Sequence, residues 1–157
     1  MKWILSAAEF VRRFRHQLRF GEQSRAPLKL LRLELREDLA ECEWLARASD
    51  AFDAHLSREI REQGTTFQAL RDAISVRELL FCAIPEIQRA ALKVYRQTEW
   101  ESRELIIEGT VNREDGPPRR IASLFMQARL CGLRFNVSDG VLESLGSEEN
   151  DLQLINR

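Results

Sequence analysis

The stretch from Leu28 to Trp44 constrains the fold more than any other part of the chain. Apolar residues occupy every second position in two runs, first Leu31, Leu33 and Leu35, and then Ala40, Cys42 and Trp44. A period of two is typical of strands with one buried face, because successive side chains point to opposite faces of a sheet. The pattern therefore predicts a β-hairpin.

A turn at Glu37-Asp38 gives this hairpin a register that is consistent on both faces. The expected opposite pairs are Leu35 with Ala40, Leu33 with Cys42 and Leu31 with Trp44 on the apolar face, and Arg32 with Glu43 on the charged face. Glu34 opposite Glu41 is the one unfavourable pair. Glu-Asp is not a preferred two-residue hairpin turn, so a longer loop is the alternative.

Two further parts of the chain have the pattern of β-structure. Leu105–Val111 is rich in β-branched residues, and Gly109 marks a bulge or a point of close backbone approach. Arg134–Ser138 and Val141–Leu145 flank Asp139-Gly140, the clearest hairpin signal in the chain. The sequence thus predicts two hairpins and one separate strand.

Helical patterns lie before and after the first hairpin. A first helix is predicted over Ala7–Phe20, with Ser6 and Glu9 as a capping box. Apolar residues recur at helical spacing from Leu56 to Ile74, but Gly64-Thr65-Thr66 interrupts them. Either one kinked helix or two shorter helices fit this stretch.

Three more helix signals follow. Ser75 with Glu78 is a second candidate capping box, which would restart the chain as a new helix. Pro85 suits the first turn of a helix that ends near Gln97. Pro118 begins a helix that runs to Cys131, with Gly132 as its C-terminal cap.

The order of these elements indicates an α+β fold. We expect a mainly antiparallel sheet of about five strands, formed by two hairpins and one strand, packed with four or five helices. The length of 157 residues suits one domain. We assign residues 1–145 to a single α+β domain and residues 146–157 to an acidic, frayed C-terminal tail.

The cysteines and the apolar runs predict a cytoplasmic protein without a transmembrane segment. Cys42, Cys82 and Cys131 lie far apart and form no CxxC pair, so they are interpreted as small core residues in a reducing compartment. The apolar N-terminus ends at Glu9, too early for a signal peptide. No apolar run reaches the length of a membrane span.

Positive charge is concentrated near the N-terminus. The whole chain has 24 basic and 25 acidic residues, a net charge of −1, and 21 of the basic residues are arginine. Residues 1–36 carry a net charge of +6, whereas residues 37–157 carry −7. The candidate anion- or partner-binding residues of the first helix form one charged wedge: Arg12, Arg13, Arg15 and Arg19. Alternatively, these arginines pair with the chain's own carboxylates.

A second candidate anion site is Arg119 and Arg120, in the first turn of the helix predicted from Pro118. Two cations there are repelled by the positive end of the helix dipole, which costs electrostatic free energy. A bound anion would remove that cost. Glu114 and Asp115 are close enough in sequence to neutralise the two arginines instead.

No catalytic residue, metal ligand or cofactor site is predicted. Asp53-Ala54-His55 offers two metal ligands, but no third ligand lies at a suitable spacing. Common motifs of hydrolases, nucleotide-binding proteins and metalloproteases are absent.

Trp100 lies among polar residues and either anchors an interface or packs over the end of the preceding helix.

These observations favour a non-enzymatic module for protein interaction or assembly, as a homodimer or with another protein, through the sheet edge or the first helix. The alternative is binding of an anionic ligand or nucleic acid through the arginine-rich helix, although no known nucleic-acid-binding motif is present. The third hypothesis is an enzyme without a recognisable motif.

Overall fold

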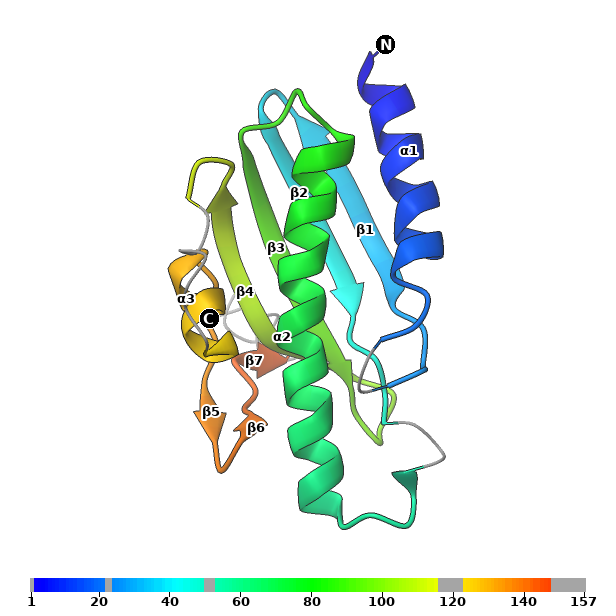
Figure 1. Ribbon diagram of the computed structural model, residues 1–157, viewed down its shortest axis with the longest axis vertical. Helices are drawn as coiled ribbons and strands as arrows, with labels where there is room; N and C mark the ends of the chain where they lie inside the picture. Colours follow the sequence, from blue (N-terminus) through cyan, green and yellow to red (C-terminus); the bar gives the residue numbers. More distant parts are fainter. Residues whose placement is uncertain (1, 22–23, 50–52, 116–122, 148–157) are drawn as a thin grey trace, which may run out of the picture.

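The computed structural model describes residues 2–21, 24–49, 53–115 and 123–147 (Figure 1). In chain order the elements are α1 (Lys2–Gln17), β1 (Lys29–Arg36), β2 (Leu39–Leu45), α2 (Arg58–Ala83), β3 (Arg89–Gln97), β4 (Arg103–Asn112), α3 (Leu124–Leu130), β5 (Val137–Ser138), β6 (Val141–Leu142) and β7 (Gly146–Ser147). The expected α+β class is confirmed. The described residues form three helices, so the prediction of four or five helices is wrong.

The main sheet is mixed, with strand order β1-β2-β3-β4-β7. β2 and β3 are parallel, and the other neighbouring pairs are antiparallel. Parallel neighbours need a long crossover connection, and α2 supplies it. β5 and β6 form a separate two-stranded sheet, so the second predicted hairpin does not extend the main one.

The hairpin of β1 and β2 confirms most of the predicted register. Leu35 pairs with Ala40, Leu33 with Cys42, Arg32 with Glu43 and Glu34 with Glu41. The expected pairing of Leu31 with Trp44 is wrong, because the register shifts between Leu30 and Arg32 and Leu30 lies opposite Trp44. The two-residue turn is retained because Glu37 adopts a positive φ of 52°.

The helix α1 begins earlier than predicted. It starts at Lys2, so Ser6 lies inside the helix and its hydroxyl donates to Glu86 rather than capping the first turn. Glu9 accepts hydrogen bonds from Arg12 and Arg13 instead of reaching back to Ser6. The capping-box prediction was wrong because the apolar residues before Ser6 continue the helix.

One uninterrupted helix of 26 residues, α2, replaces the predicted kinked or divided stretch. Ser57 is its N-cap, and the Ser57 side chain accepts a hydrogen bond from the Ile60 N–H. Gly64 is accommodated inside the helix, where an added Cβ would meet nothing within 4 Å. Ser75 is an interior residue, so the second capping box is wrong.

The segment predicted as a helix from Pro85 to Gln97 contains the strand β3. Ala90, Leu92 and Val94 alternate with more exposed residues and are at most 1% exposed. Pairing on both sides, with β2 and with β4, satisfies the backbone of β3. Helical spacing was a misleading signal because a central strand gains its stability from distant neighbours.

The structure confirms the separate strand and the roles predicted for Gly109, Gly132 and Asp139-Gly140, whereas Gly146 and Ser147, assigned to the tail, pair with β4 as β7. β4 covers the predicted strand, and a Cβ on Gly109 would collide with the carbonyl oxygen of Gly132, which confirms the close approach. Gly132 follows α3 with a φ of 104° and ends the helix there. Asp139 and Gly140 form the two-residue turn between β5 and β6.

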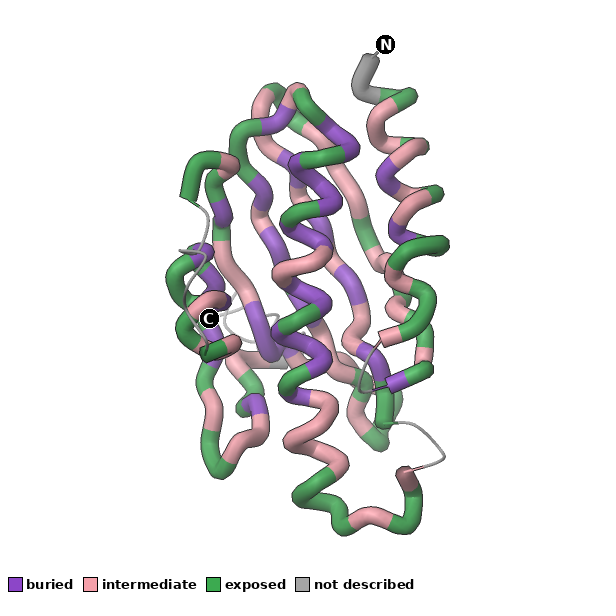
Figure 2. The backbone as a smooth tube through the Cα atoms, viewed as in Figure 1, coloured by how far each residue is buried: buried purple, intermediate pink, exposed green. Residues whose placement is uncertain are grey.

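Both long helices, α1 and α2, cover the same face of the sheet (Figure 1). Phe10 and Phe14 of α1 and Leu70, Val76 and Leu80 of α2 belong to one core cluster with the inner side chains of β2 and β3. Figure 2 shows buried positions following α2 and the central strands. The opposite face carries ion pairs of Arg32 with Glu41 and Glu43.

A buried arginine, Arg47, joins three parts of the chain. Its Nε lies 2.8 Å from Asp72 Oδ2 on α2. Its Nη atoms donate to the carbonyl oxygens of Leu18 and Arg19, just after α1, and to that of Ala26. One side chain therefore holds the end of α1, the following loop and the middle of α2 to the end of β2.

Candidate functional site

A cavity of about 670 Å³ lies at the end of the sheet beside the N-terminal half of α2. Six parts of the chain form its walls: the segment after β2, α2, β3, the turn from β3 to β4, β4 and β6. Its lining includes Arg58, Arg61, Glu62, Ala69, Arg96, Glu99, Trp100, Glu104, Ile106 and Leu142.

The composition of α2 explains why a cavity forms there. The residues that α2 turns toward it recur at helical spacing and are mostly polar: Arg58, Arg61, Glu62, Thr65, Thr66 and Ala69. The same side of the helix becomes apolar after Ala69 and packs on the sheet. The first turns of α2 therefore project past the core and leave space between the helix and the sheet end.

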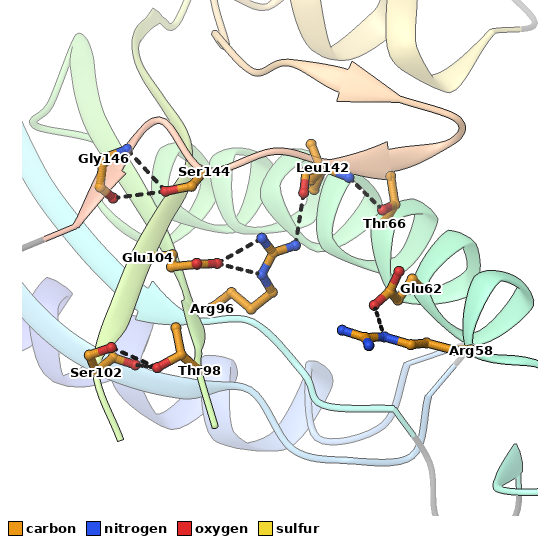
Figure 3. A network of polar contacts seen from close by, with 10 residues as sticks. All are labelled: Arg58, Glu62, Thr66, Arg96, Thr98, Ser102, Glu104, Leu142, Ser144 and Gly146. Atoms are coloured by element: carbon orange, nitrogen blue, oxygen red, sulfur yellow. Dashed lines mark hydrogen bonds and ion pairs between the residues drawn. The ribbon is translucent and has the colours of Figure 1, made fainter. Parts of the chain in front are cut away.

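Arg96 of β3 organises the floor of the cavity (Figure 3). It donates two hydrogen bonds to Glu104 Oε2, at 3.1 and 2.8 Å, across the β3–β4 pair. Its Nη1 donates to the carbonyl oxygen of Leu142, at 2.8 Å. The Leu142 N–H in turn donates to Thr66 Oγ1, so the network joins the sheet, β6 and α2.

Arg61 is the cation of this cavity without a carboxylate partner among the described residues. Arg58 is paired with Glu62 at 2.9 Å, and Arg96 is paired with Glu104. The Nε of Arg61 is buried and has no hydrogen-bond partner. A buried N–H without an acceptor costs about 1–3 kcal/mol, so this position favours a bound acceptor atom.

An aromatic and acidic rim borders the cavity at the turn from β3 to β4. Trp100 is 88% exposed, so the prediction that it packs over the end of a helix is wrong. Glu99, beside it, also lines the cavity, and Glu101 follows with a φ of 60°. The turn is closed by Thr98, whose hydroxyl contacts Ser102 at 2.6 Å.

Of the arginines predicted on the first helix, Arg12, Arg13 and Arg15 lie on α1 and Arg19 lies just after it, and none of them lines this cavity. Arg12 and Arg13 share Glu9, which lowers the Glu9 pKa to about 2 through hydrogen bonds from both guanidinium groups. Arg12, Arg15 and Arg19 line a separate hollow of about 540 Å³ on the outer side of α1. The structure thus brings three of the four predicted arginines together.

Arg119 and Arg120 lie outside the described residues, as does the expected start of their helix at Pro118. Within the described part, α3 begins at Leu124 with Ser123 as its N-cap. The neighbouring Arg113 donates to the carbonyl oxygens of Phe81 and Ile84 and so caps the C-terminal end of α2.

The cysteines occupy two different environments. Cys42 and Cys131 are buried as predicted, and burial raises the pKa of both thiols. Cys82 is exposed and its Sγ lies 3.5 Å from Arg13 Nη1, so its assignment to the core was wrong.

In the described ranges, no three His, Cys, Asp or Glu side chains gather as a metal site, and His55 is exposed.

Sequence reasoning missed the residues that form the cavity. Arg58 and Arg61 had a usable signal, because polar residues recur at helical spacing before the apolar part of α2. Arg96 had none, because it was assigned to a helix and its partners, Glu104 and Leu142, lie eight and 46 positions further along the chain.

Comparisons with protein-family models, curated proteins and solved structures give no match for this chain. Among the helices of the described ranges, we find no apolar stretch of the length that a membrane-spanning helix requires.

Proposed function

We propose that the protein binds a small organic molecule with one anionic group in the cavity between α2 and the end of the sheet. The observation that carries this proposal is the buried Nε of Arg61, which has no acceptor while Arg58 and Arg96 already have carboxylate partners. A carboxylate or phosphate oxygen of the ligand accepts from Arg61 in this proposal.

The rest of the lining defines the body of the ligand. Ala69, Ile106 and Leu142 are at most 3% exposed and supply apolar contacts. Trp100 at the rim offers a free ring face for a planar group. A cavity of this volume is of the size that binds small ligands, and its wall combines polar side chains with this group of apolar side chains. The ligand is therefore an acid with an apolar, planar body.

Binding is favoured over catalysis by the state of the carboxylates. Glu62 and Glu104, two of the three carboxylates that line the cavity, are each held by an arginine, so neither is free to act as a general base in this arrangement, and the third, Glu99, lies at the rim beside Trp100. The cavity offers charge recognition and shape, which are the requirements of a binding protein.

Naphthoate and its uncharged amide, naphthamide, test the proposal because they differ only in the charged group. Isothermal titration should show naphthoate binding at least about tenfold more tightly, the value of a charge-assisted hydrogen bond of about 1.5 kcal/mol. Arg61→Gln should remove this preference. Lys93→Gln, which removes one charge from the opposite face, should retain it. Equal affinity for acid and amide in the wild type would overturn the proposal.

Self-association is a second candidate function, and it also follows from an exposed surface. Met126 and Leu130, one turn apart on α3, are 54% and 48% exposed. We propose that a second copy covers α3. Light scattering should give a dimer that Leu130→Glu converts to a monomer, and a monomeric wild type would exclude it.

A further inference from the structure

We propose that the outer face of α1 docks on an anionic membrane surface. This face is defined by its exposed residues Ile4, Leu5, Arg12, Arg15, His16 and Arg19. The proposal is independent of the ligand cavity, which lies at the end of the sheet and shares none of these residues.

Helix geometry separates the outer face from the core. Phe10 and Phe14 are 0% and 2% exposed and attach α1 to the rest of the protein. At about 100° per residue, Leu5, Arg12 and Arg19 point away from these two rings. In Figure 1, α1 lies at the margin of the molecule, and the side chains that define the outer face are exposed.

The cations on this face are only partly neutralised. Glu9 is the acidic residue of the α1 sequence, and it is shared by Arg12 and Arg13. Arg15 has no ion pair with a described residue. The Arg19 guanidinium lies 5.2 Å from the ring centroid of Phe20, not on a carboxylate. The face therefore presents uncompensated positive charge to its surroundings.

Exposed apolar side chains distinguish a membrane from other anionic partners. Ile4 and Leu5 are 69% and 74% exposed near the start of α1, and Phe20 is 64% exposed just after its end. Cations flanked by apolar side chains match a lipid surface, because phosphate groups lie above acyl chains. A nucleic-acid backbone offers the phosphates but no apolar layer for Ile4 and Leu5.

The hollow on this face fits the same partner. Arg12, Arg15 and Arg19 border a space of about 540 Å³ whose other walls are Ala8, Val11 and His16. Three guanidinium groups around one hollow suit a phosphate group, since each can donate two parallel hydrogen bonds. Headgroup binding in the hollow and insertion of Leu5 then act together.

Vesicle flotation tests this proposal with the full chain. The protein should bind vesicles of phosphatidylcholine mixed with phosphatidylserine and not vesicles of phosphatidylcholine alone. Arg15→Ala with Arg19→Ala should lower the partition coefficient about 25-fold, since each cation at such a surface contributes about fivefold. Arg36→Ala with Lys93→Ala removes the same charge from the sheet and should leave binding unchanged.

Two further variants separate a membrane from a generic anion. Ile4→Ser with Leu5→Ser keeps every charge and should weaken vesicle binding about tenfold through lost apolar contact. Glu9→Gln releases Arg12 and Arg13 and should strengthen binding about fivefold, because it adds one unit of positive charge to this face. Unchanged binding by the serine variant would overturn the proposal, as would binding to an RNA or DNA oligonucleotide under conditions in which the vesicles do not bind.

Discussion

Arg47 and Asp72 form an ion pair that is almost completely removed from solvent, with side chains 1% and 4% exposed and 2.8 Å between Nε and Oδ2. Gln68 donates a further hydrogen bond to Asp72, at 3.0 Å. Because Arg47 also donates to the carbonyl oxygens after α1, this pair connects β2, α2 and the end of α1. It is the main polar link inside the helical layer.

Replacing Arg47 by methionine should destabilise the protein strongly. The substitution leaves Asp72 buried without its cation and leaves the Leu18 carbonyl oxygen without this donor, so we expect a loss of about 3–5 kcal/mol. Urea unfolding followed by circular dichroism measures it. In the double variant with Asp72→Leu, much of the loss should be recovered, and a loss below about 1 kcal/mol in the single variant would contradict the structural role.

The same pair predicts a pH dependence. Burial raises the Asp72 pKa above its ordinary value of 3.8, and the hydrogen bond from Arg47 opposes that shift. The folded protein then holds the Asp72 proton more tightly than the unfolded chain does, so this contribution to stability is present below pH 3.8 and is lost as the pH rises through the folded pKa. Without Arg47, the hydrogen bond that lowers the Asp72 pKa is lost, so the pKa of Asp72 in the folded protein rises further.

We therefore expect the destabilisation caused by Arg47→Met to be smaller near about pH 4 than near about pH 7. Unfolding curves of wild type and variant across this range measure the difference. Asp72→Asn provides the control because it cannot ionise, and its Arg47→Met difference should not follow the same trend.

Two glycines should respond to alanine with opposite signs. Gly64→Ala fills open space inside α2 and should stabilise the protein by about 0.8–1 kcal/mol, the helix-propensity difference. Gly109→Ala places a Cβ against the Gly132 carbonyl oxygen and should cost about 1–3 kcal/mol. Thermal unfolding compares the two, and a stabilising Gly109→Ala would contradict the close contact between β4 and the chain after α3.

Two serines distinguish a continuous α2 from a divided one. Ser57→Ala removes the N-cap hydrogen bond to Ile60 and should cost about 1 kcal/mol. Ser75→Ala changes an interior helix position and should be neutral or slightly stabilising. If Ser75→Ala proved as costly as Ser57→Ala, a second helix start at Ser75 would be indicated.

Sequence-based predictions were accurate where the interacting residues are close in the chain and failed where they are distant. The pairs Leu33–Cys42 and Leu35–Ala40 were predictable because a short turn joins strands whose apolar residues alternate. The shift at Leu31 was not, because a bulge depends on how the strand fits the core around Trp44. For β3, the alternation of Ala90, Leu92 and Val94 competed with a helical pattern, and pairing with β2 and β4 decided the outcome.

By itself, the sequence determined the α+β class, the first hairpin, the two-residue turn at Asp139-Gly140 and the concentration of arginine on α1, because periodicity and turn chemistry are local properties. Only the tertiary structure decided that Arg61, Arg96 and Trp100 surround one cavity. Those positions come from α2, β3 and the turn after β3. Their proximity depends on pairing and packing between segments distant in the chain, which no local pattern encodes.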